Sequence, residues 1–333
     1  MNSRFHIIKE LSSGGMSQTY LAQDKKQKPS QRCVIKKLKA PNNDSLSLEK
    51  MQELFEREAK TLEILGKHAQ IPGLIAYYQE ESEFYLVQEY IEGHPLIYEM
   101  SLGERWQEEQ TKNFLQEVLQ ILEYIHSHNV IHLDVKPANI IRRQHDQKLV
   151  LIDFGAVKQV NLKPAEHQPI GKTQSSVLTC IGTKGYMPDE QLIGRPNFSS
   201  GIYALGMTAI QSLTGILPFQ LREDGEGEVS WLNQAEVRDD LAKILTKMVR
   251  RYHKKRYQTA TEVLKDLTDL EEQIDVNQVV DEGCDKEPSH SATYQIPTTA
   301  FSFSDQPIDA FWNDPSHSDH HNPVDIPTAP TPD

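Results

Sequence analysis

The segment from residue 130 to residue 141 brings a carboxylate, an amine and an amide close together between apolar residues. Asp134, Lys136 and Asn139 lie within six residues of one another. Asp134 could accept a proton from a hydroxyl group, Lys136 could hold a phosphoryl group, and Asn139 could ligate Mg²⁺. Fourteen residues after Asn139, Asp153 ends the apolar run 150–152 and is followed by Phe154 and a glycine. A carboxylate in that position can reach a metal ion. Each segment alone is also compatible with a strand and a capped turn, but together, in this order, they favour phosphoryl-transfer chemistry.

Two features nearer the N-terminus could contribute phosphate binding. Residues 11–19 read Leu-Ser-Ser-Gly-Gly-Met-Ser-Gln-Thr between two strand-like runs. Small residues let backbone N–H groups approach a polyphosphate, although a hairpin turn would have a similar sequence. Lys36 directly follows the apolar residues 33–35 of a strand-like run, where an ammonium group is costly to bury unless it meets anions. Glu58, on the helix predicted next, could pair with Lys36, and the phosphates of ATP could supply further negative charge.

Hydrophobic periodicity predicts the elements that must position these residues. Strand-like runs lie at 5–8, 19–22, 33–38, 74–78 and 84–90, and helical spacing covers 49–65. Beyond Pro95 the spacing predicts helices over 108–126, 202–213, 241–249 and 261–270, of which the second is apolar enough to be buried. We therefore predict an α+β chain with a β-rich lobe over 1–92 that contains one key helix, and a helical lobe over 93–272. Clefts between such units commonly bind ligands.

Charge is distributed unevenly along the chain. The net charge is −13, but residues 275–333 contain eleven acidic residues and one lysine, so the remainder is close to neutral. A near-neutral body argues against nucleic acid as a partner, because phosphate backbones attract basic patches. The same segment has eight of the eighteen prolines and few large apolar residues. We therefore predict a disordered acidic tail over 273–333.

Cysteine usage and hydropathy indicate a cytoplasmic protein without a membrane span. The three cysteines, Cys33, Cys180 and Cys284, are far apart, which fits reduced thiols. No run of eighteen apolar residues occurs, and the N-terminus leads into strand-like sequence without the apolar core of a signal peptide.

Taken together, these motifs resemble those of the bacterial members of the eukaryotic-type (Hanks-type) serine/threonine protein kinases, over about residues 4–272. Residues 136–139 and 182–186 are similar to the Ser/Thr rather than the Tyr branch. The resemblance implies the bilobal protein-kinase fold, ATP as phosphoryl donor, Mg²⁺ or Mn²⁺ as metal, and proteins with Ser or Thr hydroxyls as substrates. Self-association for autophosphorylation is a further expectation.

The resemblance also implies roles for individual residues. Asp134 matches the catalytic base, with Lys136 and Asn139 as the other catalytic residues, and Asn139 and Asp153 match the metal ligands. Gln88 falls at the gatekeeper position, and residues 89–91 fall at the hinge whose backbone binds adenine in the family. The residues predicted to bind the nucleotide are Leu11, Ser12, Ser13, Gly14, Gly15, Met16, Ser17, Thr19, Val34, Lys36, Glu58, Gln88, Glu89, Tyr90, Ile91, Ile141 and Asp153.

The chain departs from the family pattern at positions that brace the site. Ser12 and Ser17 replace two glycines of the phosphate loop, and Leu133 replaces the arginine before the catalytic aspartate. Gly201 stands where the family has an acid that braces the catalytic loop. These departures leave open a nucleotide-binding pseudokinase or scaffold with weak or no activity.

Two further sequence features bear on these alternatives. Glu190 is retained, and the resemblance predicts that it pairs with Arg256. A small-molecule phosphotransferase is a third reading, which the Lys136-Pro137 pair and the triplet 153–155 argue against.

Overall fold

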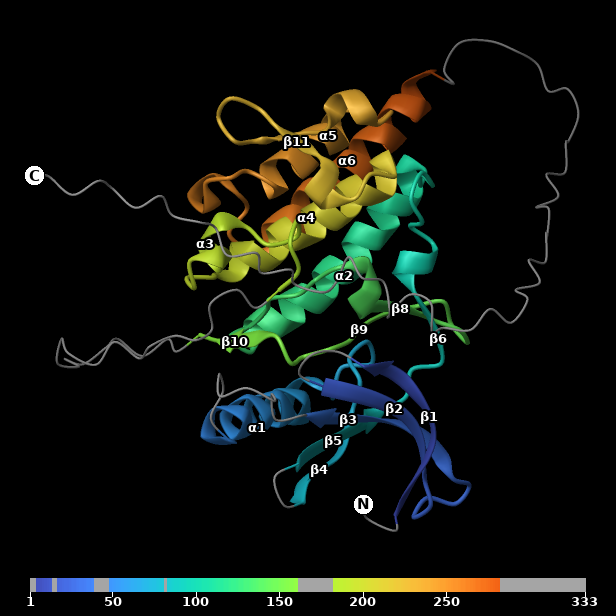
Figure 1. Ribbon diagram of the computed structural model, residues 1–333. Coiled ribbons are helices and arrows are strands. Elements are labelled where there is room, and N and C mark those ends of the chain that lie inside the picture. Colours follow the sequence, from blue (N-terminus) through green and yellow to red (C-terminus); the bar gives the residue numbers. More distant parts are fainter. Residues whose placement is uncertain (1–3, 14–16, 39–47, 81–82, 161–181, 282–333) are drawn as a thin grey trace, which may run out of the picture.

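The computed structural model describes residues 4–13, 17–38, 48–80, 83–160 and 182–281 (Figure 1). Three residues of the predicted phosphate loop, Gly14, Gly15 and Met16, lie outside these ranges, as does the part of the predicted tail beyond residue 281. Within them, no helix combines the length and the apolar composition that crossing a membrane requires.

Five antiparallel strands form the N-terminal sheet in the order β1-β2-β3-β5-β4. The strands are β1 (Phe5–Ser13), β2 (Ser17–Asp24), β3 (Gln31–Leu38), β4 (Leu74–Glu80) and β5 (Glu83–Glu89). Successive side chains of a strand point to opposite faces. In β3, Cys33 and Ile35 are therefore buried in a small core on one face, while Val34 and Lys36 line a cavity on the other.

The helix α1 (Leu48–Leu65) packs against β4 and β5 of this sheet. Apolar residues three or four positions apart form its buried side, among them Phe55, Ala59 and Leu62. Glu58 is also buried, although it is a carboxylate, so it must meet a compensating charge. The predicted helix over 49–65 agrees with the observed one.

Helices form most of the C-terminal lobe, as predicted (Figure 1). They are α2 (Glu108–Ser127), α3 (Asp189–Leu192), α4 (Phe198–Thr214), α5 (Asp239–Met248) and α6 (Ala260–Asp281), with short 3₁₀ turns η1 (Leu96–Tyr98), η2 (Pro137–Asn139), η3 (Pro218–Gln220), η4 (Leu232–Gln234) and η5 (His253–Lys255). The central helix α4 is buried along almost its whole length. It begins earlier than the predicted residue 202 because the Asn197 side chain accepts a hydrogen bond from the Ser199 N–H, and it ends at Gly215, whose φ is +66°.

The last helix, α6, extends beyond its predicted range of 261–270. It runs to Asp281, past the predicted tail start at residue 273, and the rest of the predicted tail lies outside the described residues. The sequence between 271 and 281 has neither proline nor glycine, so nothing in its composition breaks a helix that has already been nucleated.

Short strands on the side of the helical lobe nearest the N-terminal sheet lie between the two lobes (Figure 1). They form a sheet of β6 (Gly93–Pro95), β8 (Ile140–Arg143) and β9 (Leu149–Leu151), and a pair of β7 (Val130–His132) with β10 (Val157–Gln159). A further hairpin, β11 (Arg222–Glu223) with β12 (Val229–Ser230), lies in the helical lobe. The β7–β10 pair brings the segment after residue 132 next to the segment before residue 157.

A buried ion pair anchors α3 to the segment between η5 and α6. Arg256 donates to both carboxylate oxygens of Glu190, at 2.6 and 3.0 Å. The Ser200 hydroxyl adds a bond of 2.7 Å to the same carboxylate. Both charged residues are buried, and the pair is the one that the resemblance predicted.

We predict that Arg256→Met lowers the free energy of unfolding by about 3–5 kcal/mol, because it leaves the Glu190 carboxylate buried without its cation. Urea denaturation measures this change. The matched control is Arg238→Met, which removes the exposed pair with Glu108 at 2.9 Å and should cost less than about 1 kcal/mol. Equal costs for the two variants would contradict the structural role given to Glu190 and Arg256.

Candidate active site

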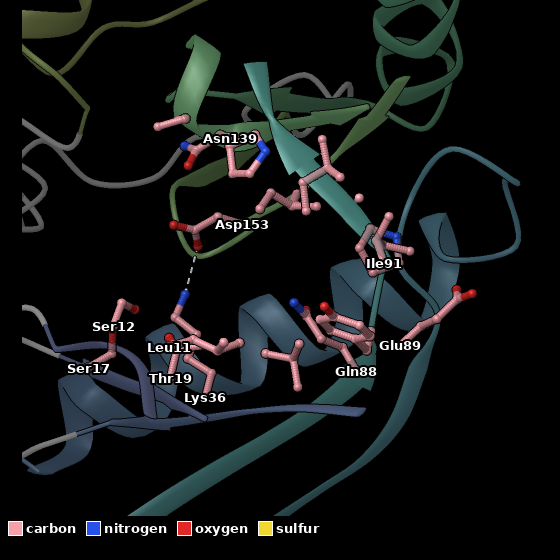
Figure 2. Close-up of a pocket in the computed structure, with 18 of the residues that line it drawn as sticks. Leu11, Ser12, Ser17, Thr19, Lys36, Gln88, Glu89, Ile91, Asn139 and Asp153 are labelled. Carbon is pink, nitrogen blue, oxygen red and sulfur yellow. Dashed lines mark hydrogen bonds and ion pairs between the residues drawn. The ribbon is translucent and has the colours of Figure 1, made fainter. Parts of the chain in front are cut away.

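A mostly apolar cavity of ≈ 300 Å³ lies between the N-terminal sheet and the short strands of the helical lobe. Figure 2 shows Asn139 and Asp153 on one side of it and Lys36 on the other. Most of the predicted nucleotide-binding residues line it: Leu11, Ser12, Ser17, Thr19, Val34, Lys36, Glu58, Gln88, Glu89, Tyr90, Ile91, Ile141 and Asp153, together with the predicted metal ligand Asn139.

The predicted and observed linings differ at several positions. Ser13, in β1, is not among the lining residues. Residues that sequence reasoning missed also line the cavity: Pro72, Gly93, Pro95, Ile97, Tyr98, Ala138 and Ile152. Ile152 directly precedes Asp153, so its place could have been anticipated. The residues from 93 to 98 belong to the connection between the lobes, where the sequence showed only a break in periodicity.

Lys36 is bound by two carboxylates from distant parts of the chain. Its Nζ lies 2.9 and 3.2 Å from the two oxygens of Glu58 and 2.8 Å from Oδ1 of Asp153. The Lys36 and Glu58 side chains are 15% and 5% exposed, whereas that of Asp153 is 45% exposed toward the cavity. The three side chains come from β3, from α1 and from the turn after β9, so this contact joins the two lobes.

The pKa values of this cluster follow from burial and charge. Burial alone would lower the pKa of Lys36, but Asp153 and Glu58 outweigh it and raise that pKa. The charge of Lys36 lowers the pKa of Asp153, whereas burial raises the pKa of Glu58 despite the same lysine. Lys36 therefore stays protonated and Asp153 stays ionised at neutral pH. The charged Lys36 and the ionised, partly exposed Asp153 carboxylate therefore lie beside the cavity.

The turn after β9 has an unusual backbone that brings Asp153 to Lys36. Asp153 has a φ of +63°, a left-handed conformation that aspartate adopts more readily than most residues. At Gly155, an added Cβ would lie 2.6 Å from the Lys36 Nζ and 3.1 Å from a Glu58 oxygen. Any side chain at position 155 would therefore displace the ion cluster.

Asp134 lies in a second polar cluster, formed by the loop after β7. Its Oδ2 accepts from the Asn139 amide at 2.9 Å and lies 3.0 Å from the Lys136 Nζ. Its Oδ1 accepts from the Thr183 hydroxyl at 2.6 Å, and that hydroxyl accepts from Lys136 at 2.6 Å. The Asp134 side chain remains 12% exposed, so the carboxylate is oriented by its neighbours and still accessible.

Backbone contacts hold the loop that carries Asp134. The Leu133 N–H donates to the Ala156 carbonyl at 2.9 Å, and the Gln191 side chain donates to the Leu133 carbonyl at 2.7 Å. At Gly201, an added Cβ would lie 3.6 Å from the His132 carbonyl oxygen and 3.8 Å from Nε2 of His126. The loop is therefore held by groups other than an acid at position 201, and sequence reasoning identified neither of them.

His126 should make the stability of the protein depend on pH. Its Nε2 is buried and has no hydrogen-bond partner among the described residues, and burial lowers its pKa from 6.5 to about 4. Between these pH values the unfolded chain binds a proton that the folded protein does not, so stability falls as the pH falls below 6.5. We predict that His126 contributes a loss of up to about 1.4 kcal/mol per pH unit in this window.

Urea denaturation at several pH values from 7.5 to 5 measures how steeply the free energy of unfolding changes with pH. This range covers the pH at which an unperturbed histidine changes its charge. His126→Gln should flatten the slope, although burial also lowers the pKa of His132, so part of the slope should remain. The control His145→Gln alters a histidine whose side chain is 72% exposed and should leave the slope unchanged. An unaltered slope in His126→Gln would contradict the prediction.

Comparison with known proteins agrees with this geometry. Residues 5–268 match the family model described as the protein kinase domain. Serine/threonine-protein kinase B of Synechocystis sp. is 40% identical over 265 residues, which cover 79% of this chain and 46% of the relative. Serine/threonine-protein kinase PknA of Nostoc sp. is 41% identical over 270 residues, covering 80% and 47%. Serine/threonine-protein kinase D of Synechocystis sp. is 44% identical over 274 residues, covering 80% and 52%.

The chain thus spans about half the length of these relatives. Its own match extends through both lobes and includes every residue of the two polar clusters around Lys36 and Asp134. The chain therefore belongs to the protein kinase family, among the bacterial Hanks-type serine/threonine kinases.

Proposed function

We propose that this chain is a serine/threonine protein kinase that transfers the γ-phosphoryl group of ATP to Ser or Thr hydroxyls of proteins. The observation that carries the proposal is a pair of charged clusters, one lining the interlobe cavity and the other joined to that lining through Asn139, whose amide donates to Asp134. One contains Lys36, Glu58 and Asp153, and the other contains Asp134 and Lys136. The named relatives are serine/threonine kinases, which supports the same activity here.

The apolar part of the cavity suits a purine base. Val34 from β3 and Ile141 from β8 line it from the two lobes. Residues 89–91, also in the lining, offer backbone donors and acceptors of the kind that fix the orientation of a ligand in an apolar site. The ammonium of Lys36 would then face the phosphates of the nucleotide.

The oxygen donors present fit a hard divalent cation. Asn139 directs its amide nitrogen to Asp134, which leaves the amide oxygen for a metal, and Asp153 is ionised and partly exposed. Carboxylate and amide oxygens are ligands that Mg²⁺ accepts, usually together with water and substrate phosphates. We propose that Asn139 and Asp153 hold Mg²⁺ or Mn²⁺, which would neutralise phosphate charge.

Asp134 is the proposed proton acceptor. Hydrogen bonds from Thr183 and Asn139 orient its carboxylate, and the carboxylate takes the proton of the substrate hydroxyl as that oxygen attacks phosphorus. Lys136 lies beside the same carboxylate and is placed to stabilise negative charge on the transferred group. The bond that forms is O–P to the substrate, and the bond that breaks is the one to the β-phosphate oxygen of ATP.

The pseudokinase alternative rested on lost bracing at Leu133 and Gly201. The bonds from Gln191 and to Ala156 hold the loop by other means, so these departures give that alternative little support. Protein substrates, a cytoplasmic location and self-association for autophosphorylation belong to the proposal. The lack of a nucleic-acid partner likewise remains a prediction.

Replacing the proton acceptor tests the proposal. Asp134→Asn keeps the shape of the side chain but removes the base, so turnover with ATP and Mg²⁺ should fall by about 10²-fold or more. ATP affinity, measured by titration calorimetry, should change less than about twofold, because Asp134 is not among the residues that line the nucleotide cavity. The control Asp240→Asn alters an exposed carboxylate on α5 and should match the wild type. Equal turnover in Asp134→Asn and wild type would contradict the kinase proposal.

A lysine pair on β3 offers a second test. Lys36→Met removes the cation that faces the phosphates, so the KM for ATP should rise, turnover should fall, or both, by about tenfold or more. Lys37 points to the opposite face of β3 and pairs with Glu83 at 2.6 Å. Steady-state kinetics of Lys37→Met should therefore stay near wild type. Equal kinetics for the two variants would contradict a role of Lys36 in nucleotide binding.

A further inference from the structure

The carboxamide of Gln191 lies beneath the loop that carries Asp134. Its Nε2 donates to the Leu133 carbonyl at 2.7 Å, and the residue is only 3% exposed. Leu133 directly precedes Asp134, so this bond fixes the backbone one residue from the proposed proton acceptor. A buried carbonyl that lost this donor would be left without solvent to replace it.

The same carboxamide limits the backbone on the other side of Asp134. Gly182 has a φ of +133°, and an added Cβ there would lie 2.5 Å from the Gln191 Nε2. The chain at residue 182 therefore approaches Gln191 in a way that only glycine permits. Thr183 follows directly and donates to Asp134 Oδ1. Gln191 thus lies between the two segments that converge on the Asp134 carboxylate.

Gln191 is itself held by a rigid neighbour. It follows Glu190 on α3, and the Glu190 carboxylate forms the buried pair with Arg256. Its backbone N–H donates to the Pro188 carbonyl at 3.0 Å. Position 201, on the neighbouring helix α4, is a glycine and offers no side chain to the loop.

We propose that Gln191 is a positioning residue for phosphoryl transfer: it fixes the Asp134 loop through Leu133 from the anchored helix α3, a support that position 201 does not supply. This inference rests on the proposed kinase activity. Small displacements of a catalytic group reduce rates strongly, so loss of this bond should affect turnover more than nucleotide binding.

Two substitutions test the bond. Gln191→Met removes the donor at similar length, and Gln191→Glu keeps the shape but replaces the donor with an acceptor. Each should lower kcat by about tenfold or more, leave the KM for ATP within about twofold, and speed amide hydrogen exchange in residues 132–139. The control Gln258→Met deletes bonds of the same kind, from a side-chain amide to the His253 and Arg256 carbonyls, and should leave all three quantities near wild type.

A side chain introduced at position 201 provides a rescue test, because it could support the Asp134 loop in place of Gln191. Gly201→Asp should change wild-type kcat by less than about twofold, because Gln191 already holds the loop, and should recover several-fold of the activity lost in Gln191→Met. Unchanged kcat and unchanged exchange in both Gln191 variants would overturn the proposal. A loss shared with Gln258→Met, or no recovery with Gly201→Asp, would overturn it too. Hydrogen exchange can be measured in a protein that has no activity. A wild type that transfers no phosphate would therefore refute the kinase proposal, and the exchange data alone would then test the role of Gln191.

Discussion

A buried ammonium group requires opposite charge at close range, and in this protein that requirement ties the two lobes together. Lys36 meets it with Glu58 from α1 and Asp153 from the turn after β9. The alternation of β3, the buried side of α1 and the left-handed backbone at Asp153 are all needed for this contact. The ionised Asp153 carboxylate is partly exposed at the cavity, where a divalent cation bound to a polyphosphate would meet it.

The Asp134 cluster depends on the helical lobe in the same way. Thr183, Lys136 and Asn139 orient the carboxylate, and the loop is held by the β7–β10 pair and by α3. The buried pair of Glu190 with Arg256 anchors α3 in turn. The position of the Asp134 carboxylate thus depends, through the loop and α3, on the core around α4, which packs against α2 and α5.

Local patterns carried most of the prediction. Helix periodicity placed α1, α2, α4 and α5, and the predicted pairs of Lys36 with Glu58 and of Glu190 with Arg256 are both present. Contacts between residues far apart in the sequence left no local pattern, so the bond from Gln191 to Leu133, 58 residues apart, and the lining by residues 93–98 were missed. The helix predicted over 261–270 runs on to Asp281 because acidic composition alone does not stop a helix, whereas proline or glycine does.

The central claim is that both clusters act on one nucleotide, with transfer to a hydroxyl group. The most direct measurement is the transfer of label from γ-labelled ATP. The wild-type protein is incubated with this ATP and a Ser/Thr-containing protein substrate, with and without Mg²⁺. Labelled residues are then mapped by mass spectrometry. The account predicts label on Ser or Thr only when a divalent cation is present. ATP binding in the presence of Mg²⁺ without any transfer of label would contradict it.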